Sequence, residues 1–161
     1  MIKCIIFDFN RTLYLPELQI IPGETLDLLR TLKKTGTLLA LISIQEAGRE
    51  DIVEKYGLSS IFSVMKFVDK KDIDVFNEVL GSIGCSAEET IVIGDRIKSE
   101  IKTGNMLGIR TVWYKNGKFS GEFPTNKNET PTFTISRLNL ILEILNNINS
   151  GIFIEERDIK I

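Results

Sequence analysis

Short apolar runs alternate with segments of helical periodicity along almost the whole chain, and this alternation is what most limits its fold. The runs have the length of strands, and the segments between them repeat apolar residues every three or four positions. The expected strands are 3–7, 37–43, 61–66, 90–93, 109–114 and 132–135. The expected helices are 23–34, 45–56, 72–83, 98–107 and 136–148. We therefore predict an α/β fold, a three-layer doubly wound parallel sheet with helices on both faces.

The chain of 161 residues has the length of one domain. We assign residues 1–148 to a core domain and residues 149–161 to a C-terminal tail. The alternating apolar pattern of the tail suits an edge strand or a segment packed on a partner. No apolar run approaches the roughly 20 residues that cross a bilayer, and the N-terminus lacks the layout of a signal peptide. We expect a soluble, cytoplasmic protein.

Composition excludes several kinds of chemistry. The 20 basic and 22 acidic residues give a net charge of -2, so the chain as a whole attracts neither nucleic acid nor anionic membrane. The absence of histidine excludes Ser/His/Asp and Cys/His catalysis and zinc bound by histidine. Cys4 and Cys85 are too few for a disulfide framework and are expected to be ordinary thiols. Carboxylates, lysines, hydroxyls and backbone amides must supply the chemistry.

Polar side chains follow the predicted strands at the edge where ligands bind in open parallel sheets. Asp8 follows the first strand, Ser43 ends the second, Lys70 or Lys71 follows the third, and Asp95 follows the fourth. One such residue alone is often a helix cap or a turn former. Four of them in chain order are better explained by a shared site.

These segments resemble the motifs of the haloacid dehalogenase-like (HAD) superfamily, and the resemblance covers nearly the whole chain. The matching segments are FDFNRT at the end of the first strand, Ser43 at the end of the second, KKDIDVF after the third and IVIGDRIKSEI at the fourth. Most members of the superfamily are Mg²⁺-dependent phosphohydrolases. The resemblance therefore implies a hydrolase that acts on a phosphorylated substrate.

The resemblance also implies roles for particular residues. Asp8 would attack phosphorus and form an aspartyl-phosphate, which divides one difficult step into two. Ser43 and a lysine would bind the phosphoryl oxygens. The spacing to the following phenylalanine favours Lys70 for the lysine, with Lys71 next and Lys66 as a third candidate.

A Mg²⁺ ion is the implied cofactor. Its ligands would be the carboxylates of Asp8, Asp95 and Glu100 and the backbone carbonyl of Asn10. Carboxylates that face one point repel each other unless a cation lies between them, and Mg²⁺ prefers oxygen ligands. Arg11 is a candidate substrate ligand through its guanidinium group, the alternative being a side chain that faces solvent.

Asn10 departs from the superfamily pattern. Relatives carry an aspartate here that protonates the leaving group and then activates water, a contribution of roughly 10²–10⁴-fold that an amide cannot make. Four explanations stay open: a slow phosphatase for acidic leaving groups, cleavage of another bond, a catalytically weak or inactive phosphate- and metal-binding regulatory module, or an introduced substitution. A response-regulator receiver is disfavoured because the chain lacks an acidic pair before Asp8.

The predicted core leaves no room for a sizeable cap domain. A loop and one helix occupy the interval from Asp8 to Ser43, and one helix and a short strand separate Ser43 from the lysines. A site without a cap is open, so its ligand could be a small phosphate ester or a macromolecular phosphate. A second copy of the chain in a homo-oligomer is another way to enclose it.

Overall fold

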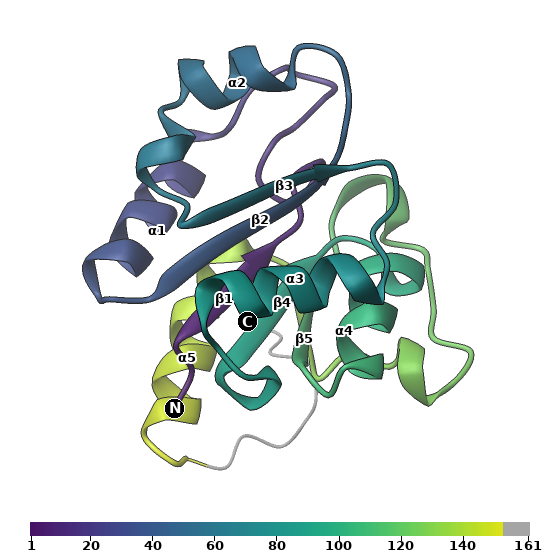
Figure 1. Cartoon of the computed structure of the whole chain (residues 1–161). Coiled ribbons are helices and arrows are strands. Elements are labelled where there is room, and N and C mark those ends of the chain that lie inside the picture. The colour runs from purple at the N-terminus through teal and green to yellow at the C-terminus, as the bar shows by residue number, and fades with distance from the viewer. Residues whose placement is uncertain (153–161) are drawn as a thin grey trace.

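The structure is a computed structural model of the chain and describes residues 1–152. A six-stranded sheet forms its centre, and every strand pairing in the sheet is parallel (Figure 1). The strands are β1 (Cys4–Phe7), β2 (Leu38–Ile44), β3 (Val64–Val68), β4 (Thr90–Gly94), β5 (Arg110–Tyr114) and β6 (Phe133–Ile135). Their order is β3-β2-β1-β4-β5-β6. The chain adds β2 and β3 on one side of β1 and then β4, β5 and β6 on the other side, so the topological switch point lies between β1 and β4. Such a switch point opens a crevice at the carboxyl ends of the strands.

Within residues 1–152, five α-helices connect or follow the strands. They are α1 (Gly23–Lys34), α2 (Arg49–Lys55), α3 (Ile73–Ile83), α4 (Lys102–Met106) and α5 (Ile141–Asn149). One π-helical turn, Ile97–Ile101, runs directly into α4. Short 3₁₀ turns lie at Leu58–Ser60, Ala87–Glu89, Gly117–Phe119, Lys127–Glu129 and Leu138–Leu140.

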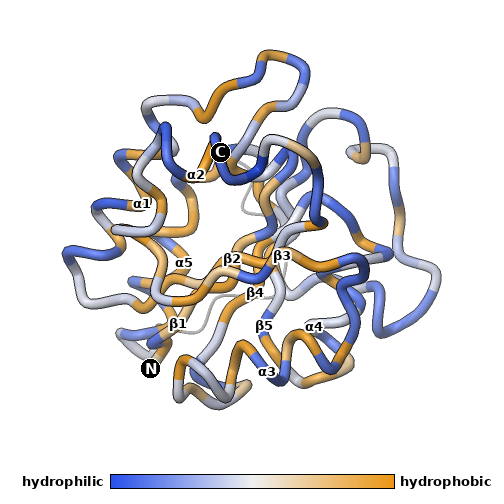
Figure 2. Tube along the Cα trace, turned by 45° about the horizontal axis from the view of Figure 1, so that its top comes forward, coloured by the Kyte–Doolittle hydropathy of each residue, from blue (hydrophilic) through white to orange (hydrophobic). Residues whose placement is uncertain are grey.

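The sheet is buried on both faces, which explains why its strands are continuous apolar runs. Ile5 and Phe7 of β1 belong to the core that α1 and α5 cover. Ile6, on the opposite face of the strand, packs in a second core with Phe76 and Val79 of α3. Figure 2 shows the mostly hydrophobic strands between α1 and α5 on one side and α3 and α4 on the other. The predicted three-layer α/β fold is confirmed.

Some element boundaries differ from the prediction. The helix expected over 45–56 begins only at Arg49, because Gly48 before it has a left-handed φ of 78°. The strand expected over 61–66 lies at Val64–Val68, since Ile61 and Phe62 follow a 3₁₀ turn and bury their side chains in the core. The helix expected over 98–107 is a π-helical turn followed by the short α4.

The described residues contain no sizeable cap domain. The stretch between β1 and α1 is a loop with two isolated bridges, Asn10 to Tyr14 and Leu15 to Ile20. None of the helices within residues 1–152 is long and apolar enough to cross a membrane. The proposed division at residue 148 stays a prediction, because most of the expected tail, from residue 153 on, lies outside the described residues.

Gly104 allows α4 to pack closely on the sheet. A Cβ atom there would lie 2.7 Å from Cγ2 of Thr111 in β5. Gly104→Ala should therefore destabilise the protein by about 1–3 kcal/mol through overpacking. At Gly81, inside α3, an added Cβ meets nothing within 4 Å, so Gly81→Ala should stabilise the fold by about 0.5–1 kcal/mol. Denaturant unfolding measures both changes, and equal effects of the two substitutions would contradict the proposed contact.

Candidate active site

The switch point brings the ends of β1 and β4 together. Phe7 and Ile93 are paired, and the backbone N–H of Asp8 donates to the carbonyl of Ile93 at 2.9 Å. Asp95 lies just beyond the end of β4, and its carbonyl accepts a hydrogen bond from Nε1 of Trp113 at 3.0 Å. These contacts fix both carboxylates at the floor of the crevice, as the positions after the two strands predicted.

A third carboxylate comes from the π-helical turn. Glu100 lies in this turn, and its side chain rests against the backbone of Gly94. A Cβ on Gly94 would lie 2.8 Å from both Cβ and Oε2 of Glu100, so a larger residue would displace the glutamate. π-Helical turns are rare and are frequent at functional sites.

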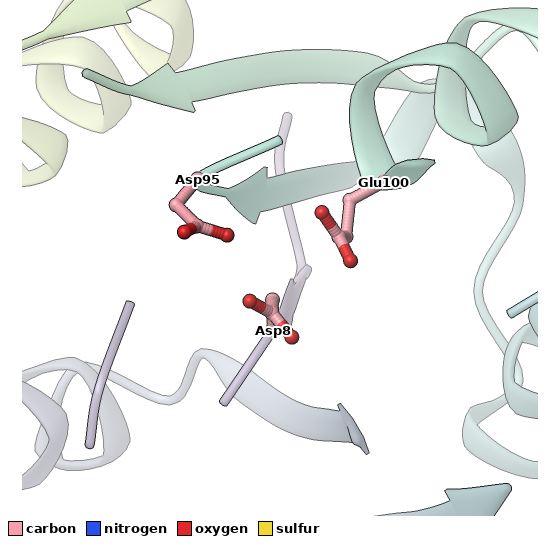
Figure 3. Close-up of side chains that lie close together, drawn as sticks. All are labelled: Asp8, Asp95 and Glu100. Atoms are coloured by element: carbon pink, nitrogen blue, oxygen red, sulfur yellow. The ribbon is translucent and has the colours of Figure 1, made fainter. Parts of the chain in front are cut away.

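Asp8, Asp95 and Glu100 converge on one point (Figure 3). One carboxylate oxygen from each lies within 4.8 Å of the others, and none of the three residues is more than 5% exposed. Burial and the charges of the other two carboxylates raise the pKa of Asp95. Burial and the charge of Glu100 raise the pKa of Asp8. The cluster is therefore a site of strong electrostatic repulsion that calls for positive charge.

Lys71 supplies one positive charge to this cluster. Its ammonium group forms ion pairs with Asp8 and, at 2.7 Å, with Oε1 of Glu100, and its side chain is 7% exposed. Burial lowers the pKa of Lys71, but the attraction of the two carboxylates is larger in sum and raises it. Lys71 is therefore a cation inside the site.

The structure does not place the predicted Lys70 in this role. Its side chain is 80% exposed and lies 3.8 Å from Asp72, although the residue lines the edge of the pocket. Lys66 pairs with Glu78 of α3 at 2.9 Å. Of these lysines, Lys71 is the one whose ammonium group contacts Asp8. The geometry favours Lys71 over Lys70 as the site lysine.

Two hydroxyl groups lie beside the nucleophile candidate. Thr12 is buried and donates from Oγ1 to Oδ2 of Asp8 at 3.2 Å, which holds the carboxylate in place. Ser43, at the end of β2, is 1% exposed and lines the same pocket. Its hydroxyl donates to the carbonyl of Ile44 at 3.0 Å. Ser43 therefore lies in the same pocket as Asp8, and its role as a phosphate ligand stays a prediction.

Asn10 belongs to a polar cluster that the sequence did not reveal. Its Oδ1 accepts from Nη2 of Arg49 at 2.9 Å, and its Nδ2 donates to Oε1 of Glu46 at 3.0 Å. Arg49 also donates to Oε2 of Glu46 at 2.7 Å, and its guanidinium carbon lies 4.7 Å from the centre of the Phe9 ring. An amide can accept from one partner and donate to the other, whereas a carboxylate could only accept. This pairing gives a structural reason for asparagine at position 10.

The site opens into a pocket of about 390 Å³. Besides the acidic cluster, its lining includes Asn10, Arg11, Ser43, Glu46, Lys71, Arg96 and Phe119. Arg11 thus lies at the pocket, as predicted, whereas Glu46, Arg96 and Phe119 had no recognisable sequence signal. The pocket has room for a phosphoryl group and a small organic part.

The side chains fit a divalent cation. Oδ2 of Asp95 and Oε2 of Glu100 are buried and have no hydrogen-bond partner among the described residues. Buried carboxylate oxygens without a partner are costly, and an oxygen-binding cation would satisfy both. The chemistry of the donor set suits Mg²⁺.

Comparisons with known proteins find similarity to hydrolases. A family model described as HAD-hydrolase-like matches residues 70–140. The glyceraldehyde 3-phosphate phosphatase of Pyrococcus furiosus is 30% identical over 144 residues, which cover 83% of this chain and 58% of that protein. The chain therefore spans less than two thirds of the length of this relative.

Solved structures show the same fold at low sequence identity. A HAD-superfamily hydrolase from Geobacter sulfurreducens is 14% identical with a TM-score of 0.71, over 89% of this chain and 100% of that one. The Bacillus subtilis protein YfnB, in a structure bound to magnesium, is 17% identical with a TM-score of 0.71, over 90% of this chain and 99% of that one. The family model and the similar phosphatase support membership of the HAD hydrolase superfamily, and the solved structures show the same fold.

The two adjacent lysines provide a matched test of the geometry. Lys71→Met removes the cation that contacts Asp8 and Glu100, so we expect it to lower the free energy of unfolding by about 3 kcal/mol at neutral pH. Lys70→Met removes an exposed partner of Asp72 and should change the free energy of unfolding by less than about 0.5 kcal/mol. Urea unfolding in the absence of divalent cations measures both values. A larger loss for Lys70→Met would contradict the placement of Lys71.

The raised pKa values of Asp8 and Asp95 predict how pH and Mg²⁺ act together. Above the ordinary carboxyl pKa of about 4, the folded protein binds more protons at these groups than the unfolded chain, so stability should fall as pH rises from about 5 to about 8. A bound cation replaces those protons. Mg²⁺ should therefore raise the melting temperature more at pH 8 than at pH 5.

Thermal unfolding with and without Mg²⁺ checks this dependence, and Asp95→Asn serves as the control because it removes one of the titrating groups. A Mg²⁺ effect of equal size at the two pH values, or one that Asp95→Asn leaves unchanged, would contradict binding at the cluster.

Proposed function

We propose that this protein is a Mg²⁺-dependent phosphohydrolase that acts through an aspartyl-phosphate on Asp8. The observation that carries the proposal is the buried cluster of three carboxylates. It is paired with one lysine, and two of its carboxylate oxygens have no hydrogen-bond partner within residues 1–152. The similarity to phosphatases over most of the chain supports it, and it suggests a small phosphate ester as the substrate.

Each side chain of the site would have its own role in phosphoryl transfer. The Asp8 carboxylate, held in position by Thr12 and Lys71, attacks phosphorus as the bond to the leaving oxygen breaks, and the leaving group departs as the anion. Lys71 and the hydroxyl of Ser43 bind phosphoryl oxygens and stabilise the charge that develops on them. Asp8, Asp95, Glu100 and the carbonyl of Asn10 would hold Mg²⁺, which neutralises phosphate charge when bound. Release of phosphate by water then restores Asp8.

Asn10 limits the substrates that the site can hydrolyse quickly. A carboxamide cannot protonate a leaving alkoxide, so turnover should favour esters whose leaving group is already acidic, such as aryl or acyl phosphates. Glu46 hydrogen-bonds to the amide of Asn10, and an aspartate there would place two carboxylates side by side. An acid at position 10 should therefore be more effective when Glu46 is replaced as well.

Phosphate release from 4-nitrophenyl phosphate, with and without Mg²⁺, tests the proposal. We expect Mg²⁺-dependent turnover that Asp8→Asn abolishes, while Lys70→Met retains it. Full activity in Asp8→Asn would exclude the aspartyl-phosphate mechanism. Binding of phosphate and Mg²⁺ without turnover of any ester would instead indicate a regulatory binding module.

A second substrate tests the part played by position 10. For glycerol 3-phosphate, whose leaving group needs a proton, the double variant Asn10→Asp/Glu46→Gln should be faster than the unmodified protein by up to about 10²-fold. Asn10→Asp alone should gain less, because Glu46 remains beside the new carboxylate. Equal gains in the single and double variants would show that Glu46 does not constrain this position.

A further inference from the structure

Two arginines lie at the mouth of the pocket, one after each of the two central strands. Arg11 follows β1 by four positions and Arg96 directly follows Asp95, and both line the pocket. Arg11 has a φ of 61°, in the left-handed region that residues with a Cβ rarely occupy. Its backbone N–H donates to the carbonyl of Tyr14 at 2.7 Å, which helps to hold this conformation. Strained backbone of this kind is frequent at ligand sites.

Both guanidinium groups lie over one aromatic ring. The guanidinium carbon is 4.2 Å from the centre of the Phe119 ring for Arg96 and 5.7 Å for Arg11. Phe119 ends a short turn after β5 and lines the same pocket. Two positive charges from different strand ends therefore lie near one ring. The attraction of each guanidinium group to the face of the ring partly offsets the repulsion between the two charges.

Each arginine has one carboxylate partner and keeps donors free. Arg11 donates through Nε to Glu17 at 3.0 Å, and its terminal nitrogens have no hydrogen-bond partner among residues 1–152. Arg96 donates to Oε1 of Glu122 through Nε and Nη2 at 3.4 and 3.3 Å. The other oxygen of Glu122 accepts from the backbone N–H of Ile97 at 2.7 Å, so this arginine is held in place.

The remaining donors are suited to an oxyanion. A guanidinium group has five N–H donors in a planar fork that matches carboxylate and phosphate oxygens. Under the proposed function, the reacting phosphoryl group would bind deeper in the site, to Lys71, Ser43 and the cation that the acidic cluster would hold. The pair at the mouth is therefore available to another part of the substrate.

We propose that Arg11 and Arg96 bind a second anionic group of the substrate, a carboxylate or a second phosphate, close to the reacting phosphoryl group. This inference rests on the proposed function, and it narrows the substrate class to phosphorylated acids and bisphosphates. The limited volume of the pocket requires that a short linker join the two anionic groups. The specificity of the site is then set by charge at the mouth.

Binding of unreactive phosphonates tests this subsite independently of turnover. The probes are 3-carboxybenzylphosphonate and its neutral carboxamide, which have nearly the same shape and differ in charge, and calorimetry in the presence of Mg²⁺ measures their affinities. We expect the carboxylate to bind at least about tenfold more tightly, the value of a charged hydrogen bond. Benzene-1,3-bisphosphonate extends the comparison to a second phosphate-like group and distinguishes the two kinds of anion.

Matched variants assign the preference to the two arginines. Arg11→Gln and Arg96→Gln should each reduce the preference for the charged probe while changing the affinity for the carboxamide little. Lys118→Gln is the control, because Lys118 lies 5.4 Å from the centre of the same ring but does not line the pocket. It should keep the preference. If the charged and neutral probes bind equally, or if both arginine variants retain the preference, the subsite is overturned.

Two further outcomes separate this inference from the proposed function. An equal loss for both probes in Arg11→Gln would assign that arginine to the reacting phosphoryl group and overturn its part in the subsite. Turnover of 4-nitrophenyl phosphate without any charge preference would leave the phosphatase proposal intact and refute the subsite alone. A charge preference without turnover would support the subsite and contradict the hydrolase.

Discussion

The electrostatic repulsion among Asp8, Asp95 and Glu100 is the constraint on which the rest of the site depends. Three buried carboxylates with oxygens within 4.8 Å of one another cannot all stay charged without compensation. Lys71 provides one charge and contacts two of the three. Burial and the negative charge that Lys71 does not compensate raise the pKa values of Asp8 and Asp95, and the same uncompensated charge favours a divalent cation. A divalent cation such as Mg²⁺ would compensate this charge and could in turn bind a phosphate group.

The fold follows from the sequence because its signals are local and repeated. Apolar runs and helical periodicity predicted the six strands and the helices, and the strand-end positions predicted where Asp8 and Asp95 would lie. The displaced strand at 61–66 shows the limit of such reasoning. A short run of apolar residues is compatible both with a strand and with a turn that packs into the core. Only tertiary contacts decide which of the two forms.

The part of the site that could not be predicted depends on the directions of side chains. Lys70 and Lys71 are adjacent and chemically identical, and the direction of the backbone before α3 decides which of them meets Asp8. Arg49 gives no sequence signal either, since a basic residue at the start of a helix usually faces solvent. Here it is 2% exposed and reaches Asn10. Contacts between residues far apart in the chain are invisible to periodicity and motif spacing.

Asn10 links two loops of the site and limits its chemistry. Held between Arg49 and Glu46, its amide fixes the loop after Asp8 to the loop after β2. The cost is the loss of a group that could transfer a proton, so the site cannot favour a substrate by assisting its leaving group. Discrimination must then come from binding and from the intrinsic acidity of the leaving group. A site of this kind benefits from contacts with parts of the substrate away from phosphorus, and the charged mouth of the pocket offers such contacts.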